Sequence, residues 1–265
     1  MHIPHETQQP MQQLKHILTA TALLMSVGGY GQSGNGLIWA DEFNTGSRPD
    51  TSKWSYNIGT GNNGWGNQEL QYYTDRPQNA EVSDGTLKIR AIKEDHNGSA
   101  YTSARLLTKG KFDFKYGKVE VRAKLPVGKG TWPAIWMLGA NISEAGWPGC
   151  GEIDIMEHKG SVPGKIYGTV HHPGHSGANG DGLTTMTARV SEDFHIYTAD
   201  WSATSIRFYV DGKLYYTFAN NAAVPFNHHF FILLNFAVGG TFGGPVDPAF
   251  TSGVLEIDYV RVYGN

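Results

Sequence analysis

Hydrophobic and polar residues alternate in short runs along most of the chain. The run Lys118–Leu125 is the clearest, because apolar side chains occupy every second position and charged side chains the positions between them. Successive side chains of a β-strand point to opposite faces, so this pattern is typical of a strand with one buried face. Beyond residue 31, no segment keeps apolar residues at helical spacing for three turns. Strands are therefore expected to dominate the fold.

Further strand-length runs are separated by glycine, proline and Asp-Gly sequences. Asp211 and Gly212 predict a two-residue hairpin turn between Ser205–Val210 and Lys213–Phe218, because both residue types tolerate positive φ angles. So many short strands can bury their apolar faces in a two-sheet sandwich or in a closed barrel, and the pattern does not choose between these. The other predicted strands are Thr86–Ile92, Tyr101–Thr108, Lys165–His172, Phe194–Trp201, Phe230–Phe236 and Val254–Tyr263.

The first 31 residues differ from the rest. Lys15 and His16 precede the apolar run Ile17–Val27, and small residues follow it. This order is that of a cleaved export signal, and the apolar run is too short to span a bilayer. We therefore predict a signal over residues 1–31, with translation starting at Met1 or Met11, and one folded domain over residues 32–265. A disordered pro-segment is the alternative interpretation.

Composition and charge narrow the function classes. The chain has 34 glycines and only 17% charged residues, as expected of a turn-rich β protein rather than a helical one. Its net charge of -3 provides no basic patch for phosphates, so nucleic acid is not an expected partner and an uncharged substrate is easier to bind. Cys150 is the only cysteine, so no internal disulfide forms and a small buried side chain is expected there.

One predicted strand carries an unusual row of acids. In Gly151–His158 acidic residues alternate with isoleucine, so Glu152 and Asp154 are expected on the face opposite the two isoleucines. Strict alternation would direct Glu157 into the core, where an unpaired carboxylate is costly. A β-bulge after Asp154, at Met156, would absorb one residue and return Glu157 to the acidic face.

Three carboxylates on one strand face suit catalysis better than structure. Carboxylates have low strand propensity and like charges repel, although a solvated acidic face remains the alternative. Retaining glycoside hydrolysis uses two carboxyl groups about 5 to 5.5 Å apart, one ionised and one protonated. Two glutamates on a bulged strand can supply this pair. The aspartate between them would separate their protonation states.

Aromatic and amide residues surround the acidic strand in sequence. Trp132 and Trp136 are four apart on one side of an extended segment, where they could stack on sugar rings or pack in the core. The segment Asn62–Tyr73 is rich in amides and glycine and could bind sugar hydroxyls or form a surface turn. His171 and His172 are adjacent in a strand, so they point to opposite faces and cannot chelate one ion together.

These segments together resemble glycoside hydrolase family 16, in its laminarinase type with a bulged acidic strand. The acidic motif carries the resemblance first, and further segments match in the same order over essentially the whole mature chain. The resemblance implies a β-jelly-roll sandwich of two curved antiparallel sheets with a concave substrate cleft. The matching segments are Trp65–Thr74, Thr102–Arg105, Gly117–Pro126, Trp132–Trp136, Glu152–Glu157, Gly168–His171 and Ile257–Tyr263.

The resemblance also assigns roles to residues. It implies that Glu152 is the nucleophile, that Glu157 is the acid/base, and that Asp154 tunes the charge and proton of the nucleophile. Catalysis needs no cofactor. A structural calcium is implied at the backbone oxygens of Glu42 and Gly85 and the side chain of Asp258, whose oxygen ligands suit calcium. The implied substrate contacts are Asn62, Arg105, Trp132, Trp136 and His171, with Asn62 and Arg105 on the glycone side.

The implied activity is endo-hydrolysis of β-1,3-glucan with retention. A mixed-linkage β-1,3-1,4-glucanase, an agarase or carrageenase type of galactan hydrolase, and a non-catalytic β-glucan-binding protein are the alternatives. The binding proteins have usually lost the acids, and this chain has all three. We expect a secreted monomer, extracellular or periplasmic, that binds β-glucan and does not insert into a membrane after signal cleavage.

Overall fold

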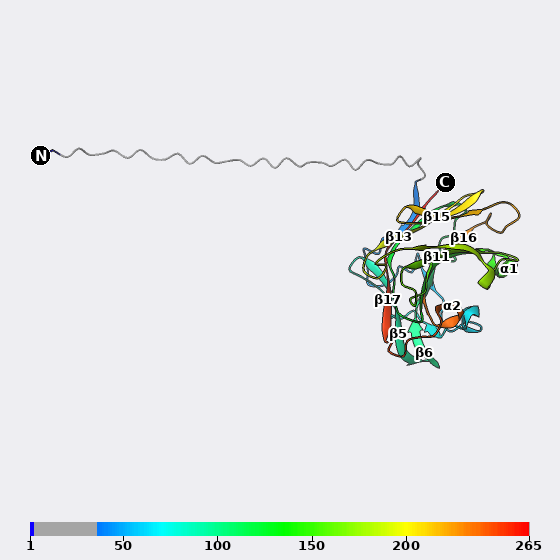
Figure 1. The fold of residues 1–265 in the computed structure, drawn as a ribbon, viewed down its shortest axis with the longest axis horizontal. Coiled ribbons are helices and arrows are strands. Elements are labelled where there is room, and N and C mark those ends of the chain that lie inside the picture. Colours follow the sequence, from blue (N-terminus) through cyan, green and yellow to red (C-terminus); the bar gives the residue numbers. More distant parts are fainter. Residues whose placement is uncertain (3–35, 265) are drawn as a thin grey trace. The chain divides into compact units, whose positions relative to one another are not determined.

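Two β-sheets pack face to face in the part of the chain that follows the predicted signal (Figure 1). The computed structural model describes residues 1–2 and 36–264. Residues 3–31 of the predicted signal lie outside the described residues. Among the described residues, no helix is both long and apolar enough to cross a bilayer.

The larger sheet contains ten of the strands within residues 36–264. Its main path ends at the hairpin β14–β15, where Asp211 and Gly212 have φ angles of 50° and 76°. Positive φ at both positions is what a type I′ turn needs, so the hairpin prediction is confirmed. In spatial order the strands are β15 (Lys213–Ala219), β14 (Ser205–Val210), β13 (His195–Trp201), β8 (Gly117–Lys124), β17 (Ser252–Tyr263), β5 (Thr86–His96), β6 (Ser99–Ser103) and β3 (Gln71–Tyr73), with β1 (Leu37–Asp41) on β17 and β4 (Ala80–Ser83) on β5.

The smaller sheet contains seven strands within the same range, and the acidic strand lies near its middle. Short helical segments connect some strands: η1 (Gly64–Gln68), α1 (Ile142–Ala145), η2 (Gly177–Asn179) and α2 (Gly240–Gly243). The strands in spatial order are β12 (Asp181–Met186), β11 (Lys165–His171), β10 (Glu152–His158), β9 (Thr131–Gly139), β16 (Phe230–Val238), β7 (Arg105–Leu107) and β2 (Ser55–Tyr56).

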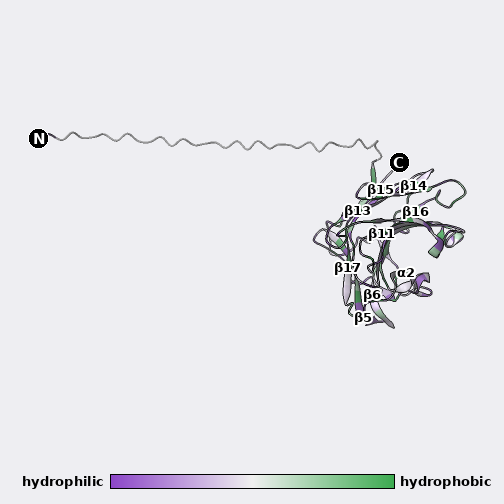
Figure 2. Cartoon of the chain, viewed as in Figure 1, coloured by the Kyte–Doolittle hydropathy of each residue, from purple (hydrophilic) through white to green (hydrophobic). Residues whose placement is uncertain are grey.

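The core lies between the two sheets and follows the period of two. Every second residue of β8, from Gly117 to Ala123, is buried, and the residues between them are partly exposed. Figure 2 shows that both hydrophobic and hydrophilic residues occur along the strands of the two sheets. β16 differs because all nine of its residues are buried, so both of its faces are covered. The sandwich predicted by the family resemblance is confirmed, and the barrel is excluded.

One predicted strand is wrong in its extent. The run Tyr101–Thr108 divides at Ala104 into β6 of the larger sheet and β7 of the smaller one. Ala104 is fully buried between the two pieces, so no exposed residue marks the point where the chain changes sheet. Hydrophobicity alone could not reveal this change, since both pieces contribute to the same core.

The bulge predicted in the acidic strand is present. Asp154 pairs with Trp136 of β9, but Met156 pairs with Ile135, so two steps along β10 match one step along β9. Ile155 and Met156 are both buried in the core. The extra residue reverses the alternation, and Glu157 therefore returns to the face that carries Asp154.

Candidate active site

The three acids of β10 share one face of the smaller sheet with two tryptophans of β9. Trp136 is directly opposite Asp154, and the Nε1 of Trp132 donates a 3.0 Å hydrogen bond to Oε1 of Glu157. Both tryptophans therefore lie beside the acids. Figure 1 shows that β11, the neighbour of β10 in the sheet, lies in the same layer as β16.

His171 lies beside two of the acids. Its Nε2 is 3.1 Å from Oδ2 of Asp154 and 3.8 Å from Oε1 of Glu152, although the nearer pair is not aligned as a hydrogen bond. The backbone pairing explains the contact, because His171 is directly opposite Glu152 in the ladder of β11 and β10. On the other side of Glu152, Nε1 of Trp147 donates a 3.0 Å hydrogen bond to Oε2.

Burial controls the protonation of the three acids Glu152, Asp154 and Glu157, called the triad below. It raises the pKa of Glu152, Asp154 and Glu157 to about 8 each, because a carboxylate loses hydration in this environment. The charge of Asp154 adds to the rise for both glutamates, while His171 opposes it. Below this pH the triad therefore does not carry three charges. An ionised carboxylate and a protonated carboxyl group can then coexist on one face, as acid/base chemistry requires.

Arg105 lies between two tryptophan rings. Its guanidinium carbon is 4.8 Å from the ring centroid of Trp65 and 4.7 Å from that of Trp136. Both distances fit cation–π contacts, which are stronger when the cation is desolvated. The Nε of Arg105 is buried and has no hydrogen-bond partner among the described residues. The predicted substrate residues Arg105 and Trp136 are thus brought together, and a donor group remains unused there.

A buried hydrogen-bond chain supports Trp136. Its Nε1 donates to Oδ1 of Asn235 at 2.7 Å, and Nδ2 of Asn235 donates to the hydroxyl of Tyr73 at 3.0 Å. That hydroxyl donates to Oε2 of Glu69 at 3.1 Å, and Nε2 of Gln71 donates to the same oxygen at 2.6 Å. Burial raises the pKa of Glu69, and its hydrogen bonds oppose the rise. The chain fixes the orientation of Trp136 from behind.

Several of these groups could not be assigned from the sequence. Trp65 contacts Arg105, and Trp147 donates a hydrogen bond to Glu152. Glu69 and Asn235 belong to the hydrogen-bond chain that supports Trp136. The amide-rich segment Asn62–Tyr73 contains Trp65 and Glu69, but no pattern marks Trp147, five residues before Glu152. In contrast, Asn62 is exposed, and no side-chain contact brings it to the triad.

Cys150 is fully buried in a small apolar cluster beside the acidic strand. Burial and the charge of Glu152 raise the pKa of its thiol to about 11. A thiol with such a pKa is neither a nucleophile nor a metal ligand at neutral pH. The prediction of a buried apolar side chain is confirmed.

The three residues predicted for calcium meet at one junction of the larger sheet. β17 pairs with β5 up to Ile257 and with β1 from Val260, so Asp258 lies where its partner changes. Glu42 follows the end of β1 and Gly85 precedes β5, which brings both backbones to this junction. The carboxylate of Asp258 forms an ion pair with Arg122. Asp258 would have to exchange Arg122 for a calcium ion, which prefers oxygen ligands such as these.

Comparison with known proteins gives a consistent result. The family model for glycosyl hydrolases family 16 matches residues 65–261. A β-glucanase from Rhodothermus marinus is 44% identical over 282 residues, which cover 96% of this chain and 97% of that protein.

Two solved structures are similar over most of both chains. The catalytic domain of an endo-1,3-β-glucanase (laminarinase) from Thermotoga petrophila has a TM-score of 0.82 and 44% identity, and the match covers 88% of this chain and 98% of that one. A Zobellia galactanivorans structure in complex with laminaritriose and laminaritetraose has a TM-score of 0.79 and 45% identity, with 86% and 99% covered.

The raised pKa of Asp154 predicts a pH-dependent stability difference. The folded-state pKa of about 8 exceeds the usual aspartate value of 3.8, so the folded protein binds the proton more tightly than the unfolded chain. The stability contribution is complete below about pH 4 and is lost as the pH rises through about 8. Asp154→Asn removes this titration, so its melting temperature should exceed that of the wild type by more at pH 8 than at pH 4.

Scanning calorimetry at both pH values measures this difference. Asp95→Asn, which changes an exposed aspartate of β5, is the control and should change melting equally at both pH values. A shift that is the same for Asp154→Asn at pH 4 and pH 8 would contradict the assignment of a destabilising buried carboxyl.

Proposed function

Since the chain belongs to glycosyl hydrolases family 16, we propose that it is an endo-1,3-β-glucanase of the laminarinase type, which cleaves internal bonds of β-1,3-glucan with retention. The observation that carries the proposal is the row of three carboxyl groups on the bulged strand β10, with Asp154 buried and the two glutamates partly buried. Their face also carries tryptophan rings, which suit the flat faces of sugar rings.

Family membership supports a double displacement. Glu152 is the nucleophile in our proposal, as the family resemblance implies; the Trp147 indole donates to its carboxylate and His171 lies nearby. It attacks the anomeric carbon to form a covalent glycosyl-enzyme while Glu157 protonates the departing oxygen. Glu157 then takes a proton from a water molecule, whose oxygen attacks the anomeric carbon and displaces the carboxylate of Glu152, so the sugar leaves with its original configuration.

Asp154 controls the charge of its neighbours in this proposal. Its carboxyl lies between the two glutamates in sequence and beside His171, and it bonds no reacting atom. When Asp154 is protonated, Glu152 can ionise without facing a second buried charge. The raised pKa of Glu157 keeps a proton available for the leaving group at neutral pH.

The remaining polar and aromatic groups are proposed to hold glucose units. Trp136 has a partly exposed ring, whereas Trp132 is 8% exposed and packs against Phe242. The buried Nε of Arg105 is an unpaired donor for a sugar hydroxyl. His171 is placed to bind the sugar beside the nucleophile. Asn62 is exposed and is proposed to contact the glycone side only when substrate is bound.

A panel of polysaccharides tests the activity. We expect release of reducing sugars from laminarin, with products of several lengths because an endo-enzyme cuts internal bonds. Proton NMR should show the β-anomer first, since retention requires it. Cleavage of mixed-linkage glucan in preference to laminarin would favour the β-1,3-1,4-glucanase alternative. Release only from agarose or carrageenan would favour a galactan hydrolase, and release from none of the four would contradict an enzymatic role.

The roles of the glutamates are tested by isosteric substitution. Glu152→Gln and Glu157→Gln should each lower kcat on laminarin by roughly 10²–10⁴ or more, because each removes a group that takes part in bond making or proton transfer. Both variants should remain folded, since an amide is easier to bury than a carboxylate. Glu144→Gln, an exposed residue of α1, is the matched control and should keep wild-type turnover. Near-normal turnover by either active-site variant would overturn its assigned role.

Calcium at the junction of β1, β5 and β17 is proposed as a structural ion. Millimolar calcium, the range typical of extracellular modules, should raise the melting temperature of chelator-treated protein by a few degrees. Asp258→Asn should remove this rise, whereas Asp247→Asn, at an exposed loop position, should keep it. No change of melting temperature with calcium, or an equal rise in Asp258→Asn, would contradict the site.

A further inference from the structure

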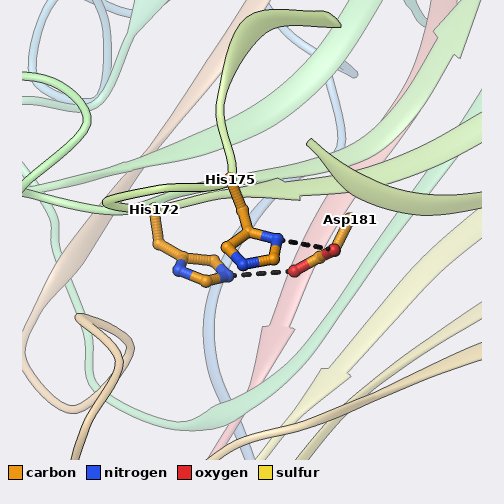
Figure 3. A group of neighbouring side chains, drawn as sticks. All are labelled: His172, His175 and Asp181. Atoms are coloured by element: carbon orange, nitrogen blue, oxygen red, sulfur yellow. Dashed lines mark hydrogen bonds and ion pairs between the residues drawn. The ribbon is translucent and has the colours of Figure 1, made fainter. Parts of the chain in front are cut away.

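Two histidines and an aspartate form a second cluster outside the proposed active site (Figure 3). Nε2 of His172 is 3.0 Å from Oδ2 of Asp181, and Nδ1 of His175 is 3.0 Å from the other carboxylate oxygen. One candidate ligand atom from each residue lies within 4.8 Å of the others. Among the described residues, the ion pairs of Asp181 are with these two imidazoles and with no lysine or arginine.

A tight turn holds the two histidines together. His172 and His175 exchange both backbone hydrogen bonds, at 2.9 Å each, around Pro173 and Gly174. Gly174 has a φ of 84°, which the third position of a type II turn requires. Residues paired in this way project their side chains to the same face, and the two rings stack with centroids 4.7 Å apart. The backbone therefore fixes the spacing of the imidazoles before any ligand binds.

The aspartate is held by the sheet. Asp181 begins β12 and pairs directly with Val170 of β11, two residues before His172. Since residues two apart in a strand share a face, Asp181 and His172 are expected on the same face, as the contact shows. The His172 side chain is 10% exposed and packs against Phe218 and Phe226, which restricts its rotation. The His175 side chain is 53% exposed and that of Asp181 is 35% exposed, so an ion can enter from solvent.

We propose that His172, His175 and Asp181 form a zinc site. Zinc binds imidazole nitrogen and carboxylate oxygen at about 2.0–2.2 Å, so tetrahedral ligands lie about 3.4 Å apart. The two nitrogen–oxygen distances of 3.0 Å need only a small expansion to admit the ion. Imidazole ligands favour zinc over calcium or magnesium, and the exposed side leaves a fourth position for water.

The site is separate from the triad but touches it through the chain. His171 points to the acids, whereas His172 points to Asp181, as expected of neighbours in a strand. Gly180, the residue before Asp181, lies against the His171 ring. A larger residue could not fit there, because its Cβ would be 2.5 Å from Cε1 of that ring. A zinc ion bound to His172, His175 and Asp181 therefore ties together the two ends of the loop Ser176–Gly180. It also holds Gly180 against the His171 ring. The ion is a structural clamp for this loop and takes no part in bond cleavage.

Calorimetric titration of zinc chloride into tag-free, chelator-treated protein tests the proposal without measuring glucanase activity. We expect one zinc ion per chain, and a melting temperature about 5–10 °C higher when zinc is a hundredfold above Kd. Cobalt(II) bound in the same position should give visible absorption bands typical of four- or five-coordinate cobalt. His175→Gln and Asp181→Asn should each lower the zinc affinity at least tenfold and weaken these bands.

The control variants separate this site from other zinc ligands. His229→Gln changes an exposed histidine that pairs with one aspartate, Asp113, and should keep wild-type zinc affinity. Asp154→Asn should also keep it, because the triad and His171 form a different group. No zinc binding by the wild type would overturn the proposal. So would equal affinity in the wild type, His175→Gln and Asp181→Asn, or a loss of the zinc ion in Asp154→Asn alone.

Discussion

The period of two in a β-strand is the constraint on which the site depends. Side chains alternate between the core and the outer face, so a strand cannot place residues 152, 154 and 157 on one face without an extra residue. The bulge at Ile155 and Met156 supplies that residue and directs both of its side chains into the core. Three carboxyl groups are thereby brought to one face, where the loss of hydration raises the pKa of each. The raised pKa values cost folding stability, but they keep a proton bound near neutral pH, where the leaving group needs one.

Much of the fold and the centre of the site could be predicted from the sequence. The pattern identified β5, β8, β13, β14, β15 and β17 of the larger sheet but missed the short strands β1, β3 and β4. Asp211 and Gly212 identified the hairpin because the turn demands positive φ. The bulge is predictable from the cost of burying Glu157 alone. The choice of a sandwich over a barrel came from the family resemblance, since strand patterns do not record how sheets close. The export signal and the monomeric state remain predictions.

What the sequence could not provide was contact between distant segments. No exposed residue marks the division of Tyr101–Thr108 between two sheets, because Ala104 is buried where the chain crosses. Trp147 and Asn235 reach the site through the packing of loops and neighbouring strands, and a single sequence does not encode that proximity in a local pattern. His175 and Asp181 have no such pattern either. They meet His172 only because a turn and a strand ladder bring them to one face.

Trapping the covalent intermediate tests the central assignment most directly. A laminari-oligosaccharide carrying fluorine at C2 and a fluoride leaving group forms a glycosyl-enzyme that turns over slowly, because the transition state for its release is destabilised. Protease digestion and fragment sequencing by mass spectrometry then locate the sugar. If Glu152 is the nucleophile of the bulged strand, the sugar is found on Glu152. A sugar on Glu157 or Asp154 would contradict the assignment of roles along β10.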